Sequence, residues 1–324
     1  MNPPVNVATT SSPLAVLGAF AGLYIIWGTT YLAIAIAIQT LPPFISGGFR
    51  FVLASALMYV WLRIKNPRPF EGVNAGAMVL CGLLLSGVGN GFVVWAQQGI
   101  PSGIAALIVA AMPVIVLVLD WIFFSRRAPS RQALIGIAIA VAGVVTIVMH
   151  TRSLSGNAQP LYLGALLLAT TGWSFGTLLQ KRSAAPTTVL SFTCGQMLVG
   201  GLLQLFMATV TGEWAQFDPA AVSLHSMLAV LYLVTFGSIL ALNCYLWLLT
   251  RVSAQKVTTY ALVNPVVALI LGALVLNERI TALAVTAAVL VLVGVSLVLF
   301  QGINPLKLLR SRRERADLGD ARQP

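Results

Sequence analysis

Charged side chains are scarce in this chain of 324 residues, where Asp, Glu, Lys and Arg together make up 8%. An ordinary soluble domain carries about 25% charged residues. It also cannot bury a hydrophobic content of 58%. The low charge therefore excludes a soluble enzyme, a disordered protein and a nucleic-acid-binding module. Histidine occurs twice and cysteine three times, without metal-ligand spacing or a disulfide framework, so we expect no metal site.

What the chain has in abundance is long apolar runs. A transmembrane helix needs roughly 20 apolar residues. Transmembrane β-strands would be about 10 residues long with alternating polarity, a pattern that is not seen here. The predicted fold class is therefore an all-α polytopic membrane protein with ten transmembrane helices. The expected helices cover residues 14–38, 43–62, 74–97, 102–124, 133–150, 161–179, 189–211, 222–249, 257–277 and 281–301.

Lys and Arg are divided unevenly between the segments that connect these helices. With the N-terminus in the cytoplasm, the cytoplasmic loops hold ten of the 19 basic residues and the C-terminal tail holds six. The opposite side holds Arg152 and Arg279, and Arg50 falls inside a helix. The positive-inside rule then predicts that both termini are cytoplasmic.

An internal repeat divides the ten helices into two halves of five. Trp95 precedes Pro113 by 18 residues, and Trp247 precedes Pro265 by the same 18. Because five is an odd number, the second half must cross the membrane in the opposite sense to the first. The sequence therefore predicts two inverted five-helix repeats, a recurrent construction of secondary transporters.

The predicted units are the repeats at 14–150 and 161–301, followed by a basic, disordered cytoplasmic tail at 302–324. In transporters built from inverted repeats, the substrate site lies near the membrane midplane between the repeats. Pro113 and Pro265 each remove a helical hydrogen bond, so we expect a kink in both helices. Whether these kinks mark the substrate site or serve packing alone stays open.

Several short motifs occur in a definite order along the two halves. They are LYIIWGTTYLAI, PP with GFRF, VGNGFVVWAQQ with PSGIAALIVAAMPV, and YALVNPVVALILGALVLNERI. Taken together, these motifs resemble the EamA family of the drug/metabolite transporter superfamily, in its YedA-like branch. The resemblance covers nearly the whole chain, about 14–301, and rests on motif order and repeat spacing more than on any single motif.

This resemblance implies a multi-pass carrier of the bacterial inner membrane with a central cavity between its halves. Family members export amino acids, related metabolites or xenobiotics, so the expected partners are a small-molecule substrate and membrane lipid. We expect no cofactor, no nucleotide and no nucleic-acid partner. A monomer is expected because ten helices can form the cavity alone. The substrate itself does not carry over, since family members differ in it.

Arg50 is the main candidate for a functional charge within the membrane. It lies seven residues into the second helix, roughly 10 Å along its axis. A charge at a helix centre costs about 2.5–3.5 kcal/mol on insertion scales and is tolerated where it lines a wet cavity or has a partner. Its planar guanidinium would suit a substrate carboxylate. The alternative is a structural role, in which the side chain reaches to the periplasmic surface.

The other candidates for the cavity wall are amide and aromatic side chains inside the predicted helices. Amides in a membrane either bond across helices, worth about 0.6 kcal/mol on average, or face a substrate. Aromatic rings near helix ends usually belong to the interface belt, but Trp27 and Trp173 lie mid-helix. The predicted cavity residues are Trp27, Tyr31, Arg50, Asn90, Trp95, Trp173, Tyr260 and Asn264.

Two carboxylates lie at helix ends. Asp120, near Arg126 and Arg127, is expected to form an interfacial ion pair rather than a substrate contact. Glu278, beside Arg279, is expected to cap a helix end or to join a periplasmic ion pair, with substrate contact as the alternative. Neither carboxylate is at the midplane, where a proton or sodium site would be expected. Facilitated transport or exchange is therefore favoured.

These residues favour a transporter over other classes of membrane protein. An intramembrane enzyme would need a nucleophile with its base, or a metal set, and no such motif occurs. The short loops offer little surface for an assembly factor or sensor. Within transport, one hypothesis is export of zwitterionic or anionic metabolites such as amino acids, and the alternative is multidrug efflux of lipophilic cations by proton antiport. Arg50, without a midplane carboxylate, favours the first.

Overall fold

The computed structural model describes residues 12–154, 159–183, 188–249, 251–252, 257 and 259–300. The predicted tail at 302–324 lies outside the described residues. The first five expected helices are confirmed as α1 (Pro13–Ala37), α2 (Pro43–Lys65), α3 (Ala75–Cys81) with η1 (Gly82–Asn90) and α4 (Gly91–Ala96), α5 (Ser102–Ala110) with α6 (Met112–Leu119) and η2 (Asp120–Ser125), and α7 (Arg131–Leu154).

The second five are confirmed as α8 (Gln159–Ser183), α9 (Val189–Val210), α11 (Leu224–Tyr232) with η4 (Leu233–Leu240) and α12 (Ala241–Leu249), α14 (Tyr260–Leu276) and α15 (Ala282–Leu299). Two short elements, α10 (Glu213–Gln216) and η3 (Pro219–Ala221), lie between α9 and α11. Within the described ranges, nine helices are long and apolar enough to cross a membrane, and α14, with 17 residues, is slightly shorter. The expected all-α fold of ten apolar helices is confirmed.

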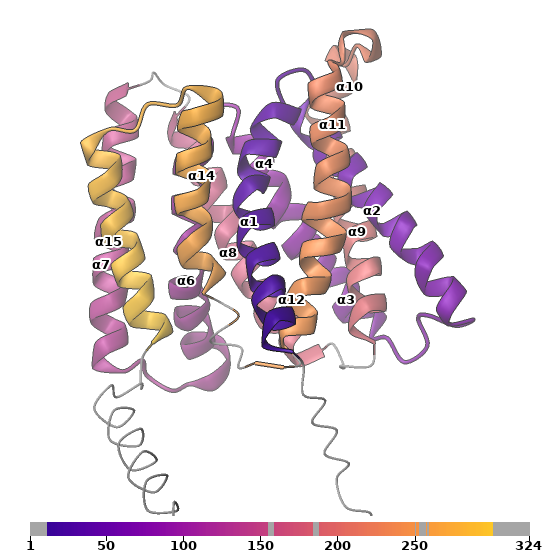
Figure 1. Ribbon diagram of the computed structural model, residues 1–324, viewed down its shortest axis with the longest axis horizontal. Helices are drawn as coiled ribbons and strands as arrows, with labels where there is room; N and C mark the ends of the chain where they lie inside the picture. The colour runs from indigo at the N-terminus through magenta and orange to yellow at the C-terminus, as the bar shows by residue number, and fades with distance from the viewer. Residues whose placement is uncertain are drawn as a thin grey trace, which may run out of the picture.

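The two repeats are interleaved rather than arranged as separate bundles. The most extensive helix contacts all join one repeat to the other: α7 with α15, α2 with α9, η1 with α9 and α8, and α14 with α1 and α5. Figure 1 shows α7 and α15 side by side at one edge of the molecule and α2 inclined at the other edge, with α1, α8 and α14 between them. The interface between the repeats is therefore the interior of the protein.

A π-helical stretch occurs at equivalent places in both repeats. Adding 152 to Trp95 and Pro113 gives Trp247 and Pro265, and adding it to the first residue of η1 gives 234, within η4. A π turn widens the helix by one residue and leaves main-chain oxygen atoms without their usual donors. The repeat in the sequence is thus matched by a repeat in helix geometry.

The two prolines differ in their effect on the helix. Near Pro113 the helix is interrupted at Ala111, between α5 and α6, and Pro113 is the second residue of α6. There its missing N–H group removes no internal hydrogen bond. Pro265 lies inside α14, which continues past it as one helix. The fourth expected helix is therefore broken close to Pro113. A kink at Pro265 in the ninth stays a prediction.

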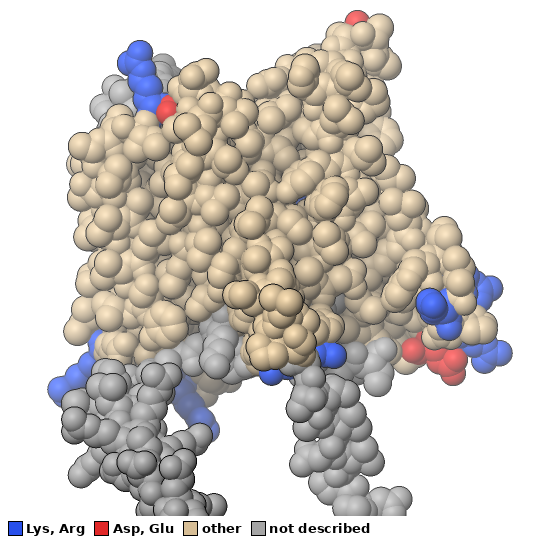
Figure 2. Space-filling model, viewed as in Figure 1, with Lys and Arg blue, Asp and Glu red and all other residues tan. Residues whose placement is uncertain are grey.

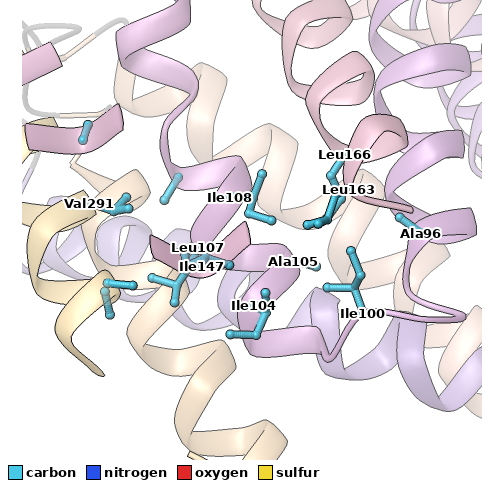
Figure 3. Packing of buried hydrophobic residues seen from close by; sticks show 14 of the residues in the cluster. Ala96, Ile100, Ile104, Ala105, Leu107, Ile108, Ile147, Leu163, Leu166 and Val291 are labelled. Atoms are coloured by element: carbon cyan, nitrogen blue, oxygen red, sulfur yellow. The ribbon is translucent and has the colours of Figure 1, made fainter. Parts of the chain in front are cut away.

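The largest buried cluster joins the helices of both repeats around α5. Figure 3 shows Ile104, Leu107 and Ile108 from α5 packing between Ile147 of α7, Leu166 of α8 and Val291 of α15. The outer surface is also apolar, because large side chains such as Leu14, Ile64, Met149, Phe206 and Leu274 are more than half exposed. An apolar exterior around an apolar core is the expected arrangement in lipid.

Basic side chains gather at one end of the bundle, here called the basic end. Figure 2 shows blue side chains along its lower edge and few at the upper edge. Arg152 in α7 and Arg279 after α14 lie at the opposite end, here called the distal end, where α1 and α4 end and α2 and α5 begin. The described basic residues at the basic end are Arg63, Lys65, Arg68, Arg126, Arg127, Arg131, Lys181, Arg182 and Arg251.

Candidate substrate cavity

A cavity lies inside the bundle, with its wall formed by both repeats. The first repeat contributes α1, α2, η1 with α4, and α5 with α6, and the second repeat contributes α8 and α14. The lining residues are Trp27, Thr30, Tyr31, Ile34, Arg50, Asn90, Val93, Ala106, Val109, Ala110, Met112, Trp173, Tyr260, Ala261, Asn264 and Pro265.

Seven of the eight residues predicted from the sequence line this one cavity, and Trp95 does not. The Trp95 ring lies 4.8 Å from the Tyr162 ring and packs against the largest buried cluster. Trp95 follows Asn90 by five residues, which is about 140° around a helix of 3.6 residues per turn. Its side chain therefore points away from the wall that Asn90 joins. That the other seven contact a substrate stays a prediction.

Aromatic rings form one wall of the cavity. The Trp27 ring lies 4.8 Å from the Tyr260 ring in an edge-to-face arrangement and 5.5 Å from the Tyr245 ring. The indole Nε1 of Trp27 donates to the main-chain oxygen of Gly237 at 3.2 Å, within the π-helical stretch η4. This bond fixes the orientation of the indole, and it joins α1 of the first repeat to the second.

Arg50 brings a charge to the cavity wall. Its side chain is only 6% exposed, so the alternative in which it reaches the membrane surface is wrong. Its Nε donates to Ser238 Oγ at 2.9 Å, and its Cζ lies 4.7 Å from the centre of the Phe51 ring. Its Nη1 is buried and has no hydrogen-bond partner among the described residues. Among the described residues, none that lines the cavity carries a carboxylate.

Two amides contribute the remaining polar groups that the sequence predicts. Asn264 is 8% exposed, and its amide nitrogen is assigned so that it donates to the main-chain oxygen atoms of Tyr24 and Tyr260, each at 3.2 Å. Asn90 is half-buried at the end of η1, and its Nδ2 donates to the Leu85 oxygen at 3.4 Å. Both amides thus bond to main-chain oxygens beside the cavity.

Ser238 and Gln204 are missing from the sequence-based candidates. Ser238 accepts a hydrogen bond from Arg50. It follows Ser86 by 152 residues, the same distance that separates Trp95 from Trp247, so a comparison of the two repeats could have drawn attention to it. Gln204 is fully buried in α9, where its Nε2 donates to the Ser86 oxygen in η1 at 2.6 Å. No sequence signal marks Gln204, because its partner is a main-chain oxygen made available by a π turn.

The two helix-end carboxylates behave as the sequence predicts, but with other partners. Asp120 forms an ion pair with Arg182 of α8 at 3.1 Å, rather than with the arginines that follow it in the chain. Glu278 caps a helix end, because its carboxylate accepts from the main-chain N–H groups of Ser102 and Gly103 at the start of α5. Neither residue lines the cavity.

Two interleaved five-helix repeats around a central cavity are an arrangement typical of membrane carriers. The EamA-like transporter family matches residues 14–149 and 161–300. The chain belongs to this family, within the drug/metabolite transporter superfamily. It is therefore a transporter and not an enzyme, and a multi-pass inner-membrane protein whose partners are a small-molecule substrate and lipid.

Individual relatives support this assignment. The chain is 37% identical over 262 residues to the uncharacterized inner membrane transporter YedA of Escherichia coli strain K12, covering 80% of this chain and 82% of that protein. It is 28% identical over 291 residues to a probable amino-acid metabolite efflux pump of the same strain, covering 85% of this chain and 92% of the pump. A solved crystal structure of 17% identity matches with a TM-score of 0.58 over 89% of this chain and 96% of its own, which shows the same fold.

The different positions of Trp27 and Trp95 lead to a prediction. We expect Trp27→Leu to raise the KM for transport about two- to tenfold, because an aromatic contact contributes on the order of 0.5–1.5 kcal/mol. Trp95→Leu should leave KM unchanged, since its ring packs against Tyr162 outside the cavity. The concentration dependence of uptake into proteoliposomes measures both, and equal shifts in the two variants would contradict the prediction.

Proposed function

We propose that this carrier exports small zwitterionic or anionic metabolites by alternating access between its two inverted repeats. Within this class of substrates we favour amino acids. The observation that carries the proposal is Arg50, a buried cation in the cavity wall with one guanidinium nitrogen unpartnered among the described residues. The substrate would supply the missing acceptor.

The electrostatics of the cavity favour an anionic group on the substrate. A guanidinium stays protonated in proteins, so Arg50 brings a permanent positive charge into the bundle. A buried charge without a partner is strongly unfavourable, and a carboxylate can accept two parallel hydrogen bonds from a guanidinium. Ser238 engages only Nε, which leaves the Nη1 edge for such a contact. A lipophilic cation would meet the same charge without a counter-charge from the lining residues.

The wall opposite a bound carboxylate would be aromatic and amide in character. Trp27 and Tyr260 supply ring faces, which attract ammonium groups as well as apolar side chains. The naming of one relative as a probable amino-acid metabolite efflux pump agrees with this chemistry. We therefore favour amino acids within the wider class of zwitterionic solutes.

The proposal includes an orientation and an assembly state. The described Lys and Arg residues concentrate at the basic end, so we place that end and both termini in the cytoplasm. The distal end then faces the periplasm. The cavity wall is built from one chain, so we propose a monomer that transports without a nucleotide or cofactor.

The test is uptake of labelled amino acids into proteoliposomes that hold the purified full chain, with and without a pH gradient. Saturable uptake without a gradient, together with competition by the matching free acid but not by its amide, is expected. Uptake of lipophilic cations alone, and only with a pH gradient, would replace the proposal with drug/proton antiport.

A further inference from the structure

A half-buried carboxylate contact joins the two repeats at the distal end. The Oε1 of Glu278 accepts from the N–H of Ser102 at 2.8 Å, and its Oε2 accepts from the N–H of Gly103 at 3.2 Å. These are the first two residues of α5, whose free N–H groups and dipole favour an anion. Glu278 belongs to the second repeat and α5 to the first, so this cap is also a bridge between repeats.

Glu213 makes the same kind of contact with the start of α2. Its two carboxylate oxygens accept from the N–H groups of Phe44 at 3.2 Å and Ile45 at 3.0 Å. Gly212 adopts a φ of 75°, which few other residues tolerate, and so turns the chain from α9 back over α2. Glu213 is only 8% exposed, and burial raises the pKa of its carboxyl. A second carboxylate of the second repeat thus holds a helix of the first.

The basic end has no matching pair of carboxylate caps among the described residues. The position equivalent to Glu278, 152 residues earlier, is Arg126, and an arginine cannot accept a hydrogen bond. The charged contact between repeats there is the ion pair of Asp120 with Arg182, whose side chains are 31% and 42% exposed. Exposed pairs of this kind contribute little to stability. The charged contacts that join the repeats at the two ends of the bundle are therefore unequal in strength.

We propose that Glu213 and Glu278 together form the periplasmic gate of the carrier, holding the N-terminal ends of α2 and α5 against the second repeat and releasing them when the cavity opens outward. The gate rests on the proposed orientation of the chain in the membrane and on the proposed alternating access. Opening the distal end would separate the repeats there, because the hydrogen bonds of Glu213 and Glu278 cross between them. The freed N–H groups and carboxylates would then be hydrated. Both glutamates act on the position of helices and need not touch the substrate.

The test measures access to the cavity from each side of the membrane. Val109 lines the cavity, so Val109→Cys, in the full chain with its three native cysteines replaced, reports access to a membrane-impermeant maleimide. In right-side-out vesicles, Glu278→Gln with Glu213→Gln should raise the labelling rate about tenfold, because charge-assisted hydrogen bonds to the helix starts are lost. In inside-out vesicles the same double variant should be labelled more slowly.

Asp218→Asn is the matched control, because Asp218 lies at the same end but accepts from the N–H of Ala220 in its own loop. It should leave both labelling rates unchanged. If a Gln variant does not yield folded protein, Glu278→Asp and Glu213→Asp keep the charge on a shorter side chain and must shift labelling in the same direction. Unchanged labelling in folded variants of Glu213 and Glu278, or an equal rise with Asp218→Asn, would overturn the gate. A shift in labelling without amino-acid uptake would keep the gate and remove the proposed substrate.

Discussion

Arg50→Gln is expected to lower kcat/KM for a carboxylate-bearing solute by about 30-fold or more, since truncating one partner of a buried charge pair costs on the order of 2–5 kcal/mol. The loss follows from the burial of Arg50 in the cavity wall and from its Nη1, which has no partner among the described residues. Gln keeps a donor near Ser238 but removes both the charge and the two-point geometry that a carboxylate needs. Initial rates of uptake into proteoliposomes measure the effect.

Two controls separate substrate binding from a general loss of function. Arg50→Lys keeps the charge without the planar fork, so it should retain more activity than Arg50→Gln but less than the parent. Arg63→Gln removes an arginine of the same helix at the exposed basic end and should leave uptake unchanged. Full activity of Arg50→Gln toward the carboxylate-bearing solute would contradict the proposed substrate class.

Gly294→Val is expected to destabilise the folded protein by about 2–3 kcal/mol, the upper part of the range for overpacking a close-packed interior. A Cβ at Gly294 would lie 2.8 Å from the Cα of Ala140 and closer still to the main-chain oxygen of Gly136. In the reverse direction, a Cβ at Gly136 would lie 2.6 Å from the Gly294 oxygen. Backbones meet here without intervening side chains, which is how small residues allow membrane helices to pack closely.

The free energy of unfolding in a mixed-micelle titration, or the thermal midpoint in detergent, measures this effect. Gly164→Val is the matched control, because Gly164 is exposed in α8 and a Cβ there would have no neighbour within 4 Å. The control should change stability by a few tenths of a kcal/mol, as surface substitutions do. Equal losses in the two variants would show that valine propensity in a helix, rather than the α7–α15 contact, sets the result.

The number and extent of the helices were determined by the sequence alone. In lipid, each spanning segment must satisfy its own main-chain hydrogen bonds, so a long apolar run becomes a helix whatever its neighbours are. The 18-residue spacing from Trp95 to Pro113, repeated from Trp247 to Pro265, was sufficient to predict two repeats. The polar cavity residues followed from related logic, because polar side chains inside a span avoid lipid by facing the interior. Trp27 and Trp173 stood out because they lie mid-helix, away from the interface belt.

The partners of each side chain were decided only by the tertiary structure. Trp95 points away from the cavity, Ser238 holds Arg50, and Glu278 reaches Ser102 across 176 residues of sequence. The direction of a side chain depends on helix rotation, and each residue inserted by a π turn rotates all later residues by about 100°. The rotation and depth of a helix in turn depend on the packing of the two interleaved repeats, which hydropathy does not encode.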